Sequence, residues 1–303
     1  MESLFKIVYQ NGEFSEDKSS ILGVSFDTIF TVVTTLLIFV LGFVVNRIIE
    51  INKENKRLKE LEEYFIKLIE LLEEPLMKQK EALVGLTKKL KQKIEQHYFV
   101  ADITSFRVEL IKEIDNKDLY DIFIKRKKGK TDTKTKLFQK IRGQIDFLDE
   151  VKKSIKISFE DLMHKSQKYD ETYKDNLKIT SEAFDNILTQ NQLRGITPDQ
   201  DPFLLSLDRI RAAWVQRGTE DTPFQDRYLA REHYLDPVQK LCRQSIADPR
   251  AVFVLKHIQE SIYAFDNIEE VKYVYRRHFL QDARGIQKAL IEMRNSLKGF
   301  AVM

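Results

Sequence analysis

Two pairs of side chains in the last third of the chain have residue types that general acid–base catalysis and charge stabilisation could use. Arg227 and His233 are separated by five residues in a stretch with a helical pattern. A histidine could act as general acid and base, and an arginine could stabilise negative charge that develops in a transition state. Arg250 and His257 form a second pair of this kind. The alternative interpretation is a surface arginine and a half-buried histidine, without chemistry.

The segment Arg227-Tyr-Leu-Ala-Arg-Glu-His233 resembles the arginine–histidine motif of HEPN-type ribonucleases, which are α-helical domains. The resemblance covers seven residues and implies that Arg227 and His233 would carry RNA cleavage in a C-terminal domain. Tyr228 stands where that family often has a different polar residue. In a chain with 17 arginines and five histidines such pairs arise readily by chance. The sequence therefore favours a non-enzymatic protein over a ribonuclease.

Other signatures of catalysis or ligand binding are missing from the sequence. It contains no GxxxxGK[ST] phosphate loop, no GxGxxG motif and no GxSxG nucleophile elbow. The single cysteine, Cys242, excludes an internal disulfide and a cysteine-based zinc site. We expect it to be a small packed residue in a reducing compartment. The histidines are scattered along the chain, so we expect no metal site and no cofactor.

The composition describes an average that no part of the chain has. The 303 residues carry a net charge of +3, and 43% of them are hydrophobic. These values exclude a wholly disordered chain and a dominantly basic nucleic-acid-binding protein. The mean hydropathy of −0.37 is typical of a soluble protein. It conceals a strongly uneven distribution of apolar residues.

The segment from Thr28 to Asn46 has nineteen residues and no charge. As a helix it would be roughly 28 Å long, close to the hydrocarbon thickness of a bilayer. A cleaved signal peptide is disfavoured because residues 1–26, which come before the segment and Asp27, are mostly polar. We therefore expect a transmembrane helix over residues 27–46, with Asp27 as its N-cap.

Flanking charges predict the orientation of this helix. Residues 1–26 contain two lysines, whereas residues 47–67 contain six lysines or arginines. Because positive flanks stay in the cytoplasm, we expect a short extracytoplasmic N-terminus and a cytoplasmic remainder. The prediction is a single-pass protein of the cell (inner) membrane.

Small and hydroxylated residues line one face of the apolar segment at spacings of three, four and seven. They are Thr28, Thr31, Thr35 and Gly42. Such a face permits close approach of a second helix, and hence homo-oligomerisation or a pore-lining surface. Alternatively, the threonine hydroxyls bond to carbonyls of their own helix.

Residues 47–193 have the pattern of a helical stalk. A short heptad runs from Leu58 to Leu72, Pro75 should end or kink the helix, and a second apolar series covers residues 83–97. A coiled coil and an intramolecular helix pair both explain this pattern. Two short helices should follow, and then a helix of about 50 residues from Leu137 to Ile187, which needs a packing partner.

A basic loop interrupts the stalk at residues 125–130. Its cations are Lys125, Arg126, Lys127, Lys128 and Lys130. The loop could contact anionic lipid headgroups or RNA, or it could be a solvated connection. No aromatic residue interleaves with the cations, so we expect no nucleic-acid partner.

Residues 194–303 have the pattern of a compact helical domain after a turn-rich linker. Four pairs of a capping residue and a proline predict helix starts: Asp201-Pro202, Thr222-Pro223, Asp236-Pro237 and Asp248-Pro249. Asn267 is expected to cap a fifth helix. The whole chain is therefore predicted to be all-α, with an N-terminal transmembrane helix, a long helical stalk and a C-terminal helical bundle.

These features suggest a membrane-anchored scaffold or sensor without catalysis. It would form a homo-oligomer or bind a protein partner through the stalk and the C-terminal domain. Two alternatives remain open. One is a membrane effector of a bacterial antiviral-defence or abortive-infection system that oligomerises and perturbs the bilayer, an analogy of layout alone. The other is the ribonuclease.

Overall fold

The structure, a computed structural model, describes residues 7–10, 13–16, 20–21, 24–93, 106–220 and 226–302. It divides into a first unit, residues 1–64, and a second unit, residues 65–303. The fold is all-α apart from short strands near the N-terminus. The domain boundary expected near residue 193 lies inside the second unit, where residues 194–201 form the turn between two helices.

The first unit begins with two small antiparallel hairpins that the sequence analysis did not anticipate. Strand β1 (Ile7–Gln10) pairs with β2 (Glu13–Glu16), and β3 (Ser20–Ile21) pairs with β4 (Val24–Ser25). Helix α1 (Phe26–Leu71) follows directly and contains the whole apolar segment.

A break at Leu72 separates α1 from α2 (Glu73–Lys91). Pro75 lies in the first turn of α2. Proline has no backbone N–H to donate to the carbonyl of Leu71, and its ring would crowd that carbonyl. The interruption predicted from Pro75 is therefore confirmed. Residues 94–97 of the second apolar series lie outside the described residues.

The two short helices expected after residue 106 are present as α3 (Glu109–Lys112) and α4 (Asn116–Tyr120). A π-helical turn, η1 (Asp121–Arg126), continues α4 and buries Phe123. The Phe123 ring centroid lies 5.3 Å from that of Phe65 and 4.9 Å from that of Phe300. This aromatic cluster packs the π-turn against the end of α1 and the end of a later long helix that contains Phe300.

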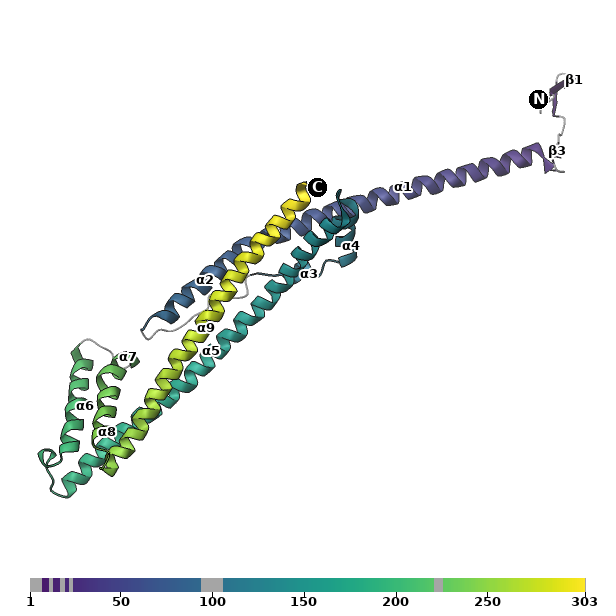
Figure 1. The fold of residues 1–303 in the computed structure, drawn as a ribbon. Helices are drawn as coiled ribbons and strands as arrows, with labels where there is room; N and C mark the ends of the chain where they lie inside the picture. The colour runs from purple at the N-terminus through teal and green to yellow at the C-terminus, as the bar shows by residue number, and fades with distance from the viewer. Residues whose placement is uncertain are drawn as a thin grey trace. The chain divides into compact units, whose positions relative to one another are not determined.

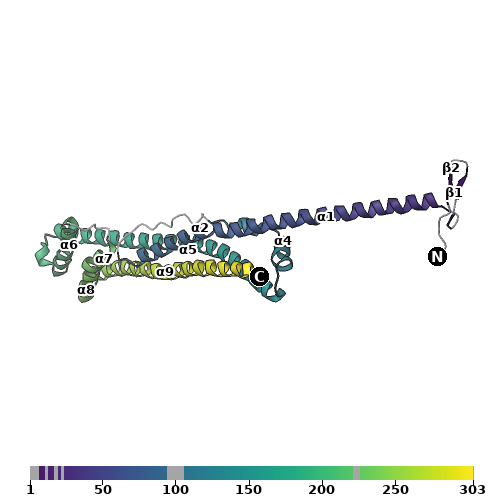
Figure 2. The ribbon, with the colours of Figure 1, turned by 90° about the horizontal axis from the view of Figure 1, so that it is seen from above.

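Two long antiparallel helices, α5 (Thr131–Leu193) and α9 (Pro249–Val302), lie side by side in the second unit (Figures 1 and 2). Gln144 of α5 donates to Glu292 of α9 over 2.6 Å. Far along the pair, His257 Nδ1 lies 2.8 Å from Asn176 Oδ1. The long helix predicted from residue 137 is confirmed, and α9 is its partner, with α2 packed beside α9.

The expected cap at Asn267 is wrong, because Asn267 lies in the interior of α9. Its side-chain amide donates to the carbonyl of Tyr263, one turn earlier in the same helix. An uninterrupted buried face carries the helix through this position, with Ile262 before it and Ile268 after it. Packing against the neighbouring helices therefore outweighs the local capping preference.

Short helices complete the second unit where α5 ends and α9 begins. They are η2 (Pro198–Gln200), α6 (Pro202–Glu220), α7 (Arg227–Ala230), the π-turn η3 (Arg231–Leu235) and α8 (Asp236–Gln244). Their apolar faces share one core with α5 and α9. The starts predicted at Asp201-Pro202 and Asp248-Pro249 are confirmed. A helix also begins at Asp236-Pro237, but Asp236 does not cap it, because η3 continues directly into α8. Thr222-Pro223 lies outside the described residues.

Candidate functional site

The apolar segment of α1 presents its side chains to the outside along its whole length. Phe39 is 75% exposed and Leu36 58% exposed. Among the described residues, α1 is the one helix long and apolar enough to cross a membrane by length and composition. Exposed apolar surface of this extent is typical of a membrane or protein contact rather than of a helix in water.

The small-residue face predicted on this segment is part of α1, so Thr28, Thr31, Thr35 and Gly42 share one side of a continuous helix. The Thr35 hydroxyl donates to the Thr31 carbonyl over 2.7 Å, which is the self-bonded alternative. A Cβ added at Gly42 would meet nothing within 4 Å. The face leaves room for a neighbouring helix.

The basic segment predicted as a loop at residues 125–130 is only partly a loop, because Lys125 and Arg126 end the π-turn η1 and residues 127–130 connect it to α5. The buried Lys134 of α5 reaches back to this segment, and its ammonium donates to the carbonyls of Ile124 and, over 3.0 Å, of Lys127. Gly129 supplies a positive φ of 106° two residues before α5 begins. The cations of Lys125, Arg126, Lys128 and Lys130 remain exposed, while Lys127 is partly buried.

In each of the two arginine–histidine pairs, both side chains contact residues outside the pair. Arg227 Nη1 forms an ion pair of 2.9 Å with Asp170 Oδ1 of α5. His233 Nε2 lies 3.3 Å from Nη1 of Arg217 in α6. In the second pair, Arg250 is bound to Asp201 and His257 to Asn176.

A buried polar cluster lies beside Arg227. The side chain of Lys272 is 5% exposed, and its ammonium lies 2.7 Å from the Tyr228 hydroxyl and 2.8 Å from Glu269. The Tyr228 hydroxyl also bonds to Glu269. A lysine this buried needs such partners, so the cluster stabilises the junction of α7 and α9. Within the described part of the chain, no three His, Cys, Asp or Glu side chains gather as metal ligands would.

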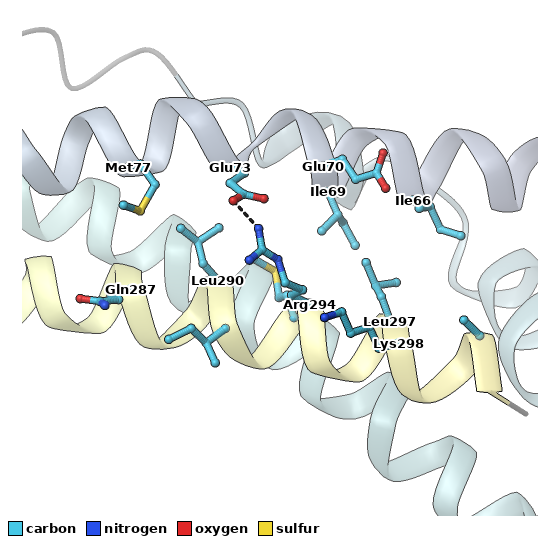
Figure 3. A pocket seen from close by; sticks show the side chains of 13 residues that line it. Ile66, Ile69, Glu70, Glu73, Met77, Gln287, Leu290, Arg294, Leu297 and Lys298 are labelled. Atoms are coloured by element: carbon cyan, nitrogen blue, oxygen red, sulfur yellow. Dashed lines mark hydrogen bonds and ion pairs between the residues drawn. The ribbon is translucent and has the colours of Figure 1, made fainter.

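An open groove of about 850 Å³, which the sequence did not reveal, lies between the α1–α2 junction and the last third of α9 (Figure 3). One wall consists of Ile66, Ile69, Glu70, Glu73 and Met77. The other wall includes Leu290, Ile291, Arg294, Leu297 and Lys298. The apolar periodicity of both segments was visible in the sequence, but which helices lie side by side was not.

The two walls of the groove carry opposite charges. The wall from α1 and α2 carries the carboxylates of Glu70 and Glu73, and the wall from α9 carries the cations of Arg294 and Lys298. One ion pair, Arg294 with Glu73, joins the walls, and its two side chains are 58% and 50% exposed. The groove is therefore an apolar strip with an acidic side and a basic side.

Comparison of the chain with protein-family models, with curated proteins and with solved structures gives no match.

Proposed function

We propose that this protein is a single-pass, membrane-anchored helical interaction protein that acts as a scaffold or sensor at the cytoplasmic face of the cell membrane. It has no catalytic role in this proposal. The N-terminus lies outside the cytoplasm, and the helices after residue 47 lie inside. The observation that carries the proposal is the exposed, uncharged stretch of α1, whose length matches the hydrocarbon core of a bilayer.

Two further observations support a role in interaction rather than in catalysis. The arginines and histidines that could serve a ribonuclease are engaged in contacts between helices, such as Arg227 with Asp170. The open groove has apolar and charged walls, which suit a helical or protein partner better than a small substrate.

The membrane anchor is tested by placing charges in the apolar segment. The variant Leu36→Arg/Val40→Arg puts two cations on residues that are 58% and 54% exposed. An arginine at the centre of a spanning helix costs roughly 3 kcal/mol on insertion scales, so two should abolish stable insertion. We expect the wild type to stay in carbonate-washed membranes and the variant to leave them.

The matched control is Ile51→Arg, an exposed position of the same helix beyond the uncharged stretch. This variant should stay in the membrane fraction. Retention of Leu36→Arg/Val40→Arg after the carbonate wash would contradict the anchor.

The orientation is tested with a membrane-impermeant maleimide. The native Cys242 is fully buried, and burial raises the pKa of its thiol to about 12, so it gives little background. We expect Ser15→Cys to be labelled in intact spheroplasts and Lys128→Cys only after lysis. The reverse pattern would overturn the proposed orientation.

A further inference from the structure

The charged walls of the groove between the α1–α2 junction and α9 are self-complementary. We propose that the groove binds the same groove of a second copy of this chain, in a parallel dimer whose two-fold axis runs along α2 and α9. The dimer rests on the proposed function, because it makes a second copy the partner of the membrane-anchored interaction protein. The pairing does not involve the apolar segment of α1. Membrane anchoring and dimerisation can therefore be lost independently of each other.

The groove has apolar surface that a partner would remove from water. Ile291 is 52% exposed at its rim, and Ile66, Met77, Leu290 and Leu297 are partly buried along it. These residues come from three helices, α1, α2 and α9, and form one strip (Figure 3). Burial of such a strip drives association without specifying an orientation.

The charges specify the orientation because the acidic side chains of one wall and the basic side chains of the other lie at the same positions along the helix axes. Glu73 contacts Arg294, and the two walls run antiparallel. Glu70, three residues before Glu73, is therefore level with Lys298, four residues after Arg294. Among the described residues, neither Glu70 nor Lys298 has an ion-pair partner in its own chain.

Two-fold symmetry then selects one arrangement. A two-fold rotation about an axis parallel to the helices places the acidic wall of one copy against the basic wall of the other. It leaves the position of each residue along the helix axis unchanged. Glu70 would face Lys298 of the second copy, twice in each dimer. Rotation about an axis across the helices would instead place Glu70 against Glu70 and Lys298 against Lys298. Like charges repel, so the charges favour the parallel dimer.

Charge reversal tests the pairing in membranes of cells that express the full chain. Glu70→Lys and Lys298→Glu each create two like-charged contacts in a homodimer, so we expect each to lower the yield of cross-linked dimer at least fivefold. Co-expression of the two variants with different tags restores both contacts between unlike copies. We expect mixed dimers to return to the wild-type yield, which also shows that both variants fold.

The controls are Lys256→Glu and Glu260→Lys, which reverse exposed charges of α9 outside the groove. They should leave the dimer yield unchanged. Dimers that resist reversal at Glu70 and Lys298, or that respond equally to the control variants, would overturn the proposal.

Cysteine cross-linking distinguishes the two symmetries. In the parallel dimer, a chain with Glu70→Cys cross-links to a differently tagged chain with Lys298→Cys through a short bis-maleimide. Neither variant cross-links efficiently to itself. Self-cross-linking of Glu70→Cys without mixed cross-links would overturn the parallel arrangement, and so would a monomer with no cross-link at either site.

Discussion

Arg250 and Asp201 connect the first turn of α9 to the first turn of α6. Arg250 Nη1 lies 2.5 Å from Asp201 Oδ2, and the Asp201 side chain is 8% exposed. The same carboxylate accepts from the backbone N–H of Leu204 and from the side chain of Asn191 near the end of α5. One residue therefore caps a helix and fixes three helices to one another.

Replacement of Asp201 should weaken the second unit strongly. Asp201→Ala removes a helix cap and an ion pair at once, which we expect to cost about 2–4 kcal/mol. Asp201→Asn keeps a cap acceptor and should cost less. Thermal unfolding of the full chain in detergent, followed by circular dichroism, measures both. The control is Asp199→Ala, which replaces an exposed residue of η2. An equal loss of stability in this variant would contradict a specific role of the Asp201 contacts.

The contribution of Asp201 should also depend on pH. Burial alone would raise its pKa, but hydrogen bonds from Arg250, Leu204 and Asn191 outweigh burial and lower the pKa from 3.8 to about 2. A lowered folded-state pKa stabilises the protein above pH 3.8, and this stabilisation is lost as the pH falls through about 2. The wild type and Asp201→Asn should therefore converge at low pH. A constant difference in unfolding midpoint would contradict this.

The basic loop depends on a lysine that is not one of its exposed cations. Lys134→Met keeps the length of the side chain but removes the ammonium that donates to the carbonyls of Ile124 and Lys127. We expect a loss of about 1–3 kcal/mol and faster amide exchange over residues 124–130. Lys136→Met, an exposed position two residues on, should change neither quantity. Unchanged exchange in Lys134→Met would show that the loop is held by other contacts.

Local signals in the sequence were enough to predict individual helices. Asp201 and Asp248 cap α6 and α9 as their Asp-Pro pairs indicate, and Pro75 lies at the break between α1 and α2. Each of these signals acts through atoms within one helical turn. The cap predicted at Asn267 is wrong because the preference of asparagine for helix ends is outweighed by contacts of α9 with residues far away in the sequence.

The groove could not be predicted from the sequence because its two walls come from segments that are far apart in the chain. Glu73 and Arg294 are 221 positions apart, and nothing in either segment states that α2 lies beside α9. Helical spacing shows which residues of each segment share a face, but not which faces meet. The same limit applies to Arg227, whose partner Asp170 belongs to a different helix.

Asp282 in α9 should destabilise the folded chain at neutral pH. Its Oδ2 is buried without a hydrogen-bond partner among the described residues. Burial raises its pKa from 3.8 to about 6, although His278 acts in the opposite direction. A raised folded-state pKa favours folding fully below pH 3.8, and this advantage is lost as the pH rises through about 6.

Asp282→Asn removes the charge and keeps the shape of the side chain. At pH 7.5 we expect it to stabilise the chain by about 1 kcal/mol, a value reduced because the carboxyl is partly exposed. The gain should shrink as the pH falls through 6 and vanish below about 3.8. Unfolding midpoints at pH 7.5 and 4.5 measure this difference. A gain of equal size at both pH values would show that the charge is not its origin.

Two glycines inside the long helices should respond differently to alanine. A Cβ at Gly143 of α5 would meet nothing within 4 Å, so Gly143→Ala should gain about 0.5–1 kcal/mol of helix propensity. A Cβ at Gly285 of α9 would lie 2.6 Å from Cζ of Phe147, so the ring must move and most of the gain is lost. Because Phe147 is 39% exposed, Gly285→Ala should be near neutral rather than severely destabilising. In a Phe147→Ala background it should recover the gain seen at Gly143, as thermal unfolding of the four variants would show. An equal effect of Gly285→Ala in both backgrounds would contradict the close contact with Phe147.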